Sequence, residues 1–498
     1  MSMKKRILFL CIIGIMSVGL SALIIVLMQV DSDLEKAAKA SDTISINAKY
    51  CDVEKTLVAS QSVEFTNRTA RPKDVVMFHV FANAFREGAL HPAVLPGEYQ
   101  EAFPNGVSYG WIDIHTVRVN GARVLVQVMG EDMNVLIVPM FSPLVPGAKV
   151  YIEIAYTVKL ANIAHRLGFT DRVVNLGNFY PVPVVYSKEE GWMVNPYSHN
   201  GDPFFNAVHN FNVTLSKPKN YVMASSGTLL NEKVSGDTRT TSVSSRAIRD
   251  WAAVLSPDFK VVSRIVDRVA VNYYFLEDDN AVHSLEVSVR ALRTFSRLFV
   301  VYPYAQLTVV QTEFLHGGME YGELVMISSC ITDRAEIDRV IVHEIAHQWW
   351  YGIIGNDQVR TAWIDEGLTE YATLLFYDEN PDLFSVGRAD YINVFRNNFA
   401  MFTGLVLGVG GSLDVRMNRH LNEFGNQHEY FFMTYVRGML LFVDLEKVLG
   451  RAVMVHALSN IARDFKFGIM TELSLISNLE KASGFTLGKF FQGYINGV

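Results

Sequence analysis

Cysteine is scarce in this sequence, with three residues in a chain of 498. No two of them lie close together in the chain, which excludes a thiolate metal site built from a cysteine cluster. Cys11 lies inside an apolar run, and Cys51 and Cys330 remain. These two could pair in an oxidising compartment, but the sequence does not place them within bonding distance, and we interpret them as two free buried thiols.

Long basic blocks are also missing beyond the first six residues, and the formal net charge is −7. We therefore expect no nucleic acid partner, and we attribute the modest acidity to ordinary solubility. Internal repeats and low-complexity tracts are absent too. Half of the residues are hydrophobic, so the sequence predicts a globular protein of two to four domains. It does not identify any protein partner.

Charge is missing entirely from Ile7 to Met28, a run of 22 residues that follows three basic residues. This run is long enough to cross a bilayer as a helix. The basic residues before it favour a cytoplasmic N-terminus. We predict a cytoplasmic tip and transmembrane anchor over residues 1–30, in a single-pass protein of the cell membrane whose remainder lies outside the cytoplasm. A cleaved signal peptide is the alternative.

Three further segments differ in their residue composition and hydrophobic pattern. Residues 31–44 are charged, small and tolerant of helix, and we predict a juxtamembrane spacer there. Residues 45–265 consist of short β-rich runs separated by turn residues, a pattern typical of a mostly antiparallel β domain. Residues 266–498 are dominated by the helical period, with breaks at Gly410-Gly411 and at Gly484. The predicted fold class is α+β.

The stretch RVIVHEIAHQWWYG, residues 339–352, is largely apolar yet carries two histidines and a glutamate. Asp333 and Glu336 form a capping-box pattern before it. We predict a helix from there to Tyr351, with Gly352 as its stop.

His343 and His347 are four positions apart, so a helix places both imidazoles on one face, where they can bind one cation. Glu344, between them, is placed to accept a proton from water, as in zinc peptidases. A catalytic zinc needs a third protein ligand, and Glu366 follows His347 after 18 residues, on a second helix predicted at about Ile364–Tyr377.

Two neighbouring carboxylates are alternatives to Glu366 as the third ligand. Asp365 precedes it directly, and Glu370 lies one helical turn beyond it. Glu370 could equally support a ligand or lie at the surface.

The pattern His343-Glu344-x-x-His347, 18 residues, Glu366 resembles the gluzincin aminopeptidase family, typified by aminopeptidase N and leukotriene A4 hydrolase. Three more segments resemble that family in the same order: GDPFFNAVHNFNVTL (201–215) a stretch of its β domain, GGMEY (317–321) its Gly-x-Met-Glu-Asn exopeptidase motif, and TYVRGMLLFVDLEKVLG (434–450) its Tyr-x-Lys-Gly segment. Two departures are Tyr321 in place of asparagine and Arg437 in place of lysine.

The resemblance implies an N-terminal antiparallel β saddle or sandwich domain followed by a thermolysin-like, mainly helical catalytic domain. It implies removal of N-terminal residues from peptide substrates, with one Zn²⁺ per chain. The ligands would be His343, His347 and Glu366, with Glu344 as general base. Tyr435 would stabilise the oxyanion, and Tyr430 is the alternative tyrosine.

The exopeptidase motif supplies the remaining expectations. Glu320 would bind the substrate α-amine, and Gly317 and Gly318 would let the substrate backbone approach an edge strand. The chain ends soon after the catalytic region, so we expect no long C-terminal helical domain and a more open cleft. A catalytically weak, membrane-tethered zinc-binding module and a non-peptide, epoxide-type hydrolase are the alternative functions.

Overall fold

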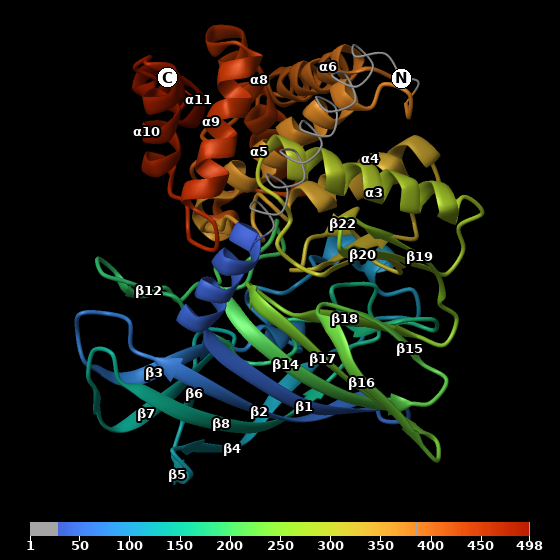
Figure 1. The fold of residues 1–498 in the computed structure, drawn as a ribbon, viewed down its shortest axis with the longest axis vertical. Coiled ribbons are helices and arrows are strands. Elements are labelled where there is room, and N and C mark those ends of the chain that lie inside the picture. The colour runs from blue at the N-terminus through green and yellow to red at the C-terminus, as the bar shows by residue number, and fades with distance from the viewer. Residues whose placement is uncertain (1–27, 385, 498) are drawn as a thin grey trace, which may run out of the picture.

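The computed structural model describes residues 28–384 and 386–497. Strands dominate the first half of the chain and helices the second, and the two parts lie one above the other (Figure 1). This arrangement confirms the predicted α+β class, with a β-rich part followed by a mainly helical part.

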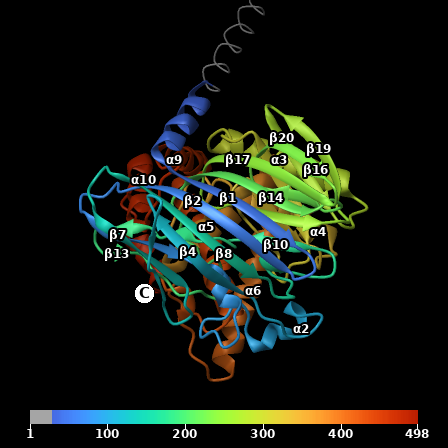
Figure 2. The same ribbon diagram turned by 90° about the horizontal axis from the view of Figure 1, so that it is seen from below.

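An eight-stranded sheet forms the base of the β-rich part, and Figure 2 shows it from below. Its neighbours pair in an antiparallel sense except β1 and β14, which are parallel. Buried and more exposed side chains alternate along β1 and β8, because one face of the sheet covers the core. In spatial order the strands are β16 (Thr228–Ser235), β17 (Thr238–Ile248), β14 (His209–Pro218), β1 (Asp42–Cys51), β2 (Thr56–Thr66), β8 (Lys149–Lys159), β4 (Trp111–Val119) and β5 (Ala122–Val124).

Two smaller sheets and a short hairpin lie between this base and the helices. One sheet has the order β15 (Val222–Ser225), β18 (Ala252–Ser256), β10 (Val174–Gly177) and β9 (Leu167–Phe169). The other has the order β11 (Val182–Pro183), β3 (Lys73–His79), β7 (Val135–Leu144) and β6 (Gln127–Met129), and the hairpin is β12 (Tyr186–Ser187) with β13 (Gly191–Trp192). Short helical turns are η1 (Phe81–Phe85), η2 (Pro96–Glu98) and α2 (Tyr99–Ala102). The run ARVLVQV, which the sequence suggests as one strand, is divided between β5 and β6 of different sheets at the exposed Leu125.

A five-stranded mixed sheet opens the second part, in the order β19 (Lys260–Val266), β20 (Val269–Phe275), β21 (Gln306–Thr312), β23 (Leu324–Ser328) and β22 (Gly318–Met319). β20, β21 and β23 are parallel, and the edge strand β22 is antiparallel to β23. The predicted domain boundary between residues 265 and 266 falls at the end of β19, and β19 pairs with β20 on the other side of that boundary. The division into domains stays a prediction.

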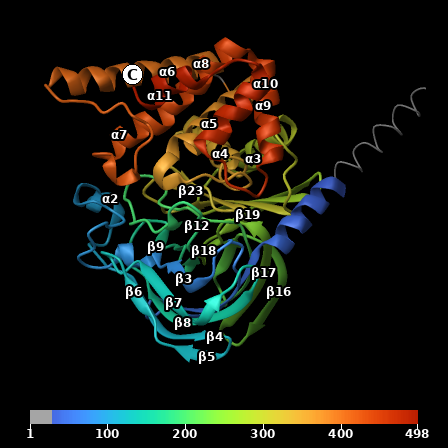
Figure 3. The same ribbon diagram turned by 90° about the vertical axis from the view of Figure 1, so that its left-hand side faces the viewer.

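Helices cover this sheet and fill the rest of the second part (Figure 3). They are α3 (Ala281–Leu298), α4 (Arg334–Ala346), α5 (Gln358–Glu379), α6 (Arg388–Gly408), η3 (Leu421–Glu423), α7 (Gln427–Phe431), a π-helical turn η4 (Phe432–Val436), α8 (Arg437–Leu449), α9 (Arg451–Asp464), α10 (Glu472–Ser483) and α11 (Gly488–Ile495). The predicted breaks are confirmed, since α6 ends at Gly408 and Gly484 caps α10 with a φ of 74°.

The two helices predicted to carry the metal ligands have different ends from those expected. Asp333 caps α4 as predicted, accepting a hydrogen bond from the Glu336 backbone N at 2.9 Å. However, α4 ends at Ala346 rather than Tyr351, because Tyr351 has a φ of 145°, which a helix cannot contain. α5 begins at Gln358, earlier than predicted, with Asp357 as its cap.

The predicted anchor Ile7–Met28 lies outside the described residues except for Met28. In the two described ranges, no helix has the length and hydropathy needed to cross a membrane. Residues 28–40 form a helix, called here the N-terminal helix, which lies along one side of both parts (Figure 3). Its Asp33 pairs with Lys466 at 3.1 Å, and the Asn210 side chain donates to the Ala38 carbonyl at 2.8 Å. The predicted spacer is therefore largely a docked helix.

Cys51 and Cys330 are both free. The prediction of two unpaired thiols is confirmed, but the expectation that both are buried is wrong. Cys51 is half-buried, and Cys330 is exposed in the turn before α4.

Candidate active site and metal centre

α4 and α5 bring the predicted metal ligands together in the interior of the second part. His343 lies in the last turn of α4, His347 follows its end, and Glu366 lies on α5. All three residues are at most 4% exposed. Burying several ionisable groups together destabilises the folded state unless the groups pair with one another or bind an ion.

The facing atoms of the three residues form a small triangle. His343 Nε2 and His347 Nε2 are 3.1 Å apart, and Glu366 Oε2 lies 3.2 Å from His347 Nε2 and 3.4 Å from His343 Nε2. A tetrahedral zinc with ligand bonds of about 2.0–2.1 Å needs donors spaced by about 3.3 Å. The donor types and their spacing therefore fit a zinc ion.

The outer nitrogen of each imidazole is also engaged. His347 Nδ1 lies 3.0 Å from the Trp350 carbonyl oxygen and 3.0 Å from the Thr369 hydroxyl. His343 Nδ1 lies 3.2 Å from Glu370 Oε1. Such contacts fix the ring orientation and leave Nε2 free for a metal.

Glu370 is thus neither a ligand in the triangle nor a surface residue. It is fully buried, pairs with Arg339 at 3.2 Å, and accepts a hydrogen bond from the Tyr391 hydroxyl at 2.8 Å. Of the two roles left open by the sequence, the structure places it in the supporting one, next to His343.

Glu366 is held ionised in this arrangement. Burial acts to raise its pKa, but the charges of His347 and His343 and their hydrogen bonds outweigh that effect and lower the pKa to about 2. Its second oxygen, Oε1, accepts a hydrogen bond of 2.6 Å from the Tyr435 hydroxyl. The carboxylate therefore presents one oxygen to the histidines and the other to Tyr435.

Tyr435 lies in the π-helical turn between α7 and α8. An extra residue in that turn changes the direction of the side chains relative to a regular helix, and such turns are frequent at functional sites. The Tyr435 ring stacks on His343 with 5.7 Å between ring centroids. Tyr430, the alternative tyrosine, lines the same cavity, but its hydroxyl has no hydrogen-bond partner among the described residues. Arg437 points elsewhere and donates to the Tyr494 carbonyl on α11.

The glycine pair lies directly beside the predicted base. Gly318 starts the edge strand β22, and a Cβ at this position would lie 2.6 Å from Glu344 Cγ and overlap its carboxylate. Only glycine allows this approach of strand and carboxylate. Gly317 is open by comparison, because its nearest neighbour would be Val340 Cγ2 at 3.8 Å.

Glu320 is buried close to His347 and Asp365 and is not among the residues that line the cavity. Burial, together with the nearby Asp202, raises its pKa well above the usual value. Gln358, at the start of α5, donates from Nε2 to both Glu320 Oε1 and Asp365 Oδ2 at 2.8 Å. Tyr321 does not bond Glu320; its ring reaches towards Gly177.

Asp365, the other alternative ligand, is held by two amide groups. It accepts hydrogen bonds of 2.8 Å from Asn356 and from Gln358. A candidate ligand atom of Asp365 lies within 4.8 Å of one from Glu320 and one from His347. The possible ligand set Glu320, His347 and Asp365 shares His347 with the set His343, His347 and Glu366, so both belong to one metal centre. In the second of these sets the donor atoms lie only 3.1–3.4 Å apart.

The β-rich part contributes residues that the sequence did not single out. A cavity of about 220 Å³ adjoins the centre, and its lining includes Arg166 and Asp202 together with Gly318, Glu344 and Tyr435. Arg166 Nη1 donates to Asp202 Oδ1 at 2.5 Å, and both residues are largely buried. Asp202 lies within the segment 201–215 that resembles the family's β domain, so the sequence offered a reason to consider it as a site residue. The sequence offered no such reason for Arg166 or Gln358.

Arg249 and Asp250, which follow β17, tie the β-rich part to the segment after α4. Arg249 donates to the carbonyl oxygens of Tyr351 and Gly468. Asp250 accepts hydrogen bonds from the Tyr351 hydroxyl and, at 3.0 Å, from the Gly322 backbone N. Burial raises the pKa of Asp250 to about 6, against the lowering effect of these bonds.

Comparison with known proteins agrees with this geometry. The peptidase family M1 domain matches residues 283–494. Aminopeptidase M1-A of Oryza sativa subsp. japonica is 23% identical over 300 residues, 57% of this chain and 33% of that protein. The alanine/arginine aminopeptidase of Saccharomyces cerevisiae is 24% identical over 413 residues, 76% of this chain and 45% of that protein. The chain thus spans less than half the length of these relatives.

A solved structure extends the likeness of fold over most of the chain. The M1 zinc metallopeptidase from Deinococcus radiodurans superposes with a TM-score of 0.62 at 14% sequence identity, covering 92% of this chain and 93% of that one. The resemblance drawn from the sequence is therefore confirmed over residues 283–494, which match the peptidase family M1 domain.

Proposed function

We propose that this chain is a zinc aminopeptidase that removes N-terminal residues from peptides, with one Zn²⁺ bound by His343, His347 and Glu366. The observation that carries the proposal is the triangle of donor atoms, 3.1–3.4 Å apart, beside a cavity that also contains Glu344. A zinc ion held there acts as a Lewis acid and makes water a stronger nucleophile near neutral pH.

The chain's own residues divide the remaining work. Glu344 accepts the proton of the attacking water and delivers it to the leaving amine. The Tyr435 hydroxyl, whose single proton bonds to Glu366 in the absence of substrate, would donate instead to the oxygen that gains negative charge. The edge strand that begins at Gly318 offers backbone groups to an extended substrate.

Glu320 supports the aminopeptidase assignment rather than an endopeptidase one. A free α-amine is largely cationic near neutral pH, with a reference pKa of about 7.7–8.0. A cationic amine bound next to Glu320 would favour its ionised carboxylate, whose pKa is otherwise raised by burial. Acylated termini, whose nitrogen carries no charge, would not have this effect. Asp202, whose negative charge acts on Glu320, adds to the attraction for a cation.

The test is an assay of the purified chain on aminoacyl-anilides, with and without a chelator, alongside N-acetylated versions of the same peptides. We expect chelator-sensitive cleavage of the free-amine substrates and little cleavage of the acetylated ones. Glu320→Ala should lower kcat/KM for free-amine substrates by orders of magnitude, because it removes one partner of a buried charge pair.

Two results would contradict the proposal. Equal cleavage of free and acetylated peptides would remove the exopeptidase assignment. No cleavage of either by a protein that contains stoichiometric zinc would favour a tethered zinc-binding module, or an epoxide-type hydrolase if an epoxide were opened instead.

We also propose that the catalytic part lies outside the cytoplasm, supported by the uncharged run Ile7–Met28 and the basic residues before it. Protease treatment of intact cells should then release the peptidase activity. Activity that stays protected until the membrane is permeabilised would place the domain on the other side.

A further inference from the structure

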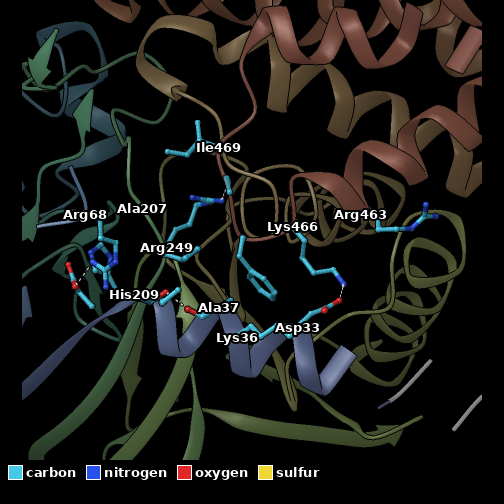
Figure 4. Close-up of a pocket in the computed structure, with 16 residues that line it drawn as sticks. Asp33, Lys36, Ala37, Arg68, Ala207, His209, Arg249, Arg463, Lys466 and Ile469 are labelled. Carbon is cyan, nitrogen blue, oxygen red and sulfur yellow. Dashed lines mark hydrogen bonds and ion pairs between the residues drawn. The ribbon is translucent and has the colours of Figure 1, made fainter. Parts of the chain in front are cut away.

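A large cavity that adjoins the described residues lies away from the metal centre. It has a volume of about 680 Å³, is open to solvent, and is lined by the N-terminal helix, by the β-rich part near His209, and by the end of α9 with the loop that follows it (Figure 4). Cavities of this size accommodate small organic ligands. The β-rich part, the helical part and the N-terminal helix all contribute to its walls.

Its lining is basic, although the chain as a whole has a net charge of −7. Five basic side chains stand against two acidic ones, Asp33 and Asp42; the basic residues are Lys36, Arg68, Arg249, Arg463 and Lys466. Lys466 pairs with Asp33 at 3.1 Å, and Arg68 pairs with Asp42 at 2.6 Å.

The other three cations, Lys36, Arg249 and Arg463, have no carboxylate partner within 4.0 Å among residues 28–384 and 386–497. Arg249 is 1% exposed, and its guanidinium bonds only to backbone carbonyl oxygens. Burial lowers the pKa of Arg249, and this effect outweighs the nearby Tyr351, Tyr304 and Asp250, which act to raise it.

One buried polar atom in the same lining lacks a hydrogen-bond partner among the described residues. His209 is 3% exposed, and its Nδ1 makes no hydrogen bond to the described residues. An anion in the cavity would compensate the unpaired positive charge of Arg249 and could accept a hydrogen bond from His209.

We propose that this cavity is a binding site for a phosphate-bearing anion. Guanidinium and ammonium groups that converge on one space are the usual partners of phosphate oxygens. The shared chemistry has two possible sources, a free phosphate compound or the headgroup of an anionic lipid. The second is reachable, because Lys36 lies about 12 Å along the helix from Met28, where the predicted anchor ends.

Binding should hold the N-terminal helix against the end of α9 and the loop that follows it, since Lys36 lies on the first of these elements, Arg463 in the last turn of α9 and Lys466 in the loop. The measurable consequence is slower amide hydrogen exchange in residues 28–40 and 463–469. This consequence does not depend on the peptidase activity, so its failure would leave the proposed function untouched.

The experiment uses the full chain in phosphatidylcholine nanodiscs, titrated with inorganic phosphate, and in nanodiscs that contain phosphatidylglycerol. Sodium chloride at equal ionic strength is the salt control. The test variant is Lys36→Ala/Arg463→Ala, which removes two exposed side chains and should leave the fold intact. The matched control is Lys39→Ala/Lys481→Ala, which removes the same charge at exposed positions outside the cavity.

We expect protection of both segments in the parent chain and in the control variant. The test variant should need at least about tenfold more anion, a change of about 1.4 kcal/mol, because it removes two charged groups that can donate hydrogen bonds to the anion. Protection by inorganic phosphate would identify a free anion as the source, and protection only with phosphatidylglycerol would identify the lipid headgroup. No protection by either anion, or an equal response of the two double variants, would overturn the proposal.

Discussion

Gly318→Ala tests the placement of the predicted base, because it adds one methyl group directly against Glu344. The new Cβ would lie 2.5 Å from Glu344 Cδ and 2.6 Å from Cγ. Carbon atoms in contact rest about 3.5–4.0 Å apart, so the carboxylate has to move by about 1 Å. The strand cannot yield easily, since Gly318 pairs with Ile327 and the Gly317 carbonyl accepts from Ser328 N at 2.9 Å.

A displacement of about 1 Å in a catalytic group costs on the order of 10²-fold in rate. That factor corresponds to about 2.7 kcal/mol in the activation barrier. We therefore expect Gly318→Ala to lower kcat/KM on an aminoacyl-anilide about a hundredfold. Zinc content by elemental analysis should be unchanged, because none of the three ligands is displaced.

The neighbouring Gly317→Ala is the matched control. Its Cβ would meet only Val340 Cγ2 at 3.8 Å, an ordinary contact, and its activity should stay within a fewfold of the parent. The reasoning is refuted if Gly318→Ala keeps near-normal activity, or if both alanine variants lose the same amount. A loss of zinc in Gly318→Ala would show instead that the strand supports the ligands.

Three further predictions concern the metal ligands with the base, the two tyrosines, and the buried His79. Glu366→Ala should lose zinc as well as activity, whereas Glu344→Gln should retain zinc and lose most turnover; full zinc occupancy in Glu366→Ala, measured by elemental analysis, would move the third ligand elsewhere. Tyr435→Phe should lower kcat about 10²–10³-fold, while Tyr430→Phe, whose lost hydroxyl has no partner in the described structure, should stay near normal; equal losses in both would show that the hydrogen bond to Glu366 does not distinguish the two tyrosines. Burial lowers the pKa of His79 to about 4 from the usual 6.5, so the histidine is neutral in the folded protein near neutral pH. The free energy of unfolding is therefore about 3 kcal/mol higher above pH 6.5 than below pH 4, and this difference is lost as the pH falls between the two values. Urea unfolding at several pH values should show a shallower acid loss in His79→Phe than in the parent, and parallel curves would contradict the assignment.

Features that depend on short sequence separations were predictable. The four-residue spacing of His343 and His347 fixes their common face, and the Asp333 cap follows from its place three residues before Glu336. β14 coincides with the run HNFNVTLSKP because alternation with a period of two is a local property of the chain. The third ligand came from a spacing shared with a known family rather than from local periodicity.

Features that depend on tertiary contact were not predictable. α4 stops at Ala346 because the next residues turn inward and bury Trp349 and Trp350, a demand of the core that outweighs the helical pattern. The contact of Arg166 with Asp202 spans 36 residues, and that of Gln358 with Glu320 spans 38. The π-helical turn that holds Tyr435 has no sequence pattern of its own.

Arg249 and Asp250 have a consequence for any attempt to recombine this chain with its relatives. These adjacent residues of the β-rich part hold the loop after His347 from one side and the strand end after Glu320 from the other. A chimera that takes its first part from a relative would keep these hydrogen bonds only if that relative also has an arginine and an aspartate at the two positions. Without them, the segment around Tyr351 would lose these contacts with the β-rich part. Two loops from different parts of the chain therefore have to be transferred together to keep this site intact.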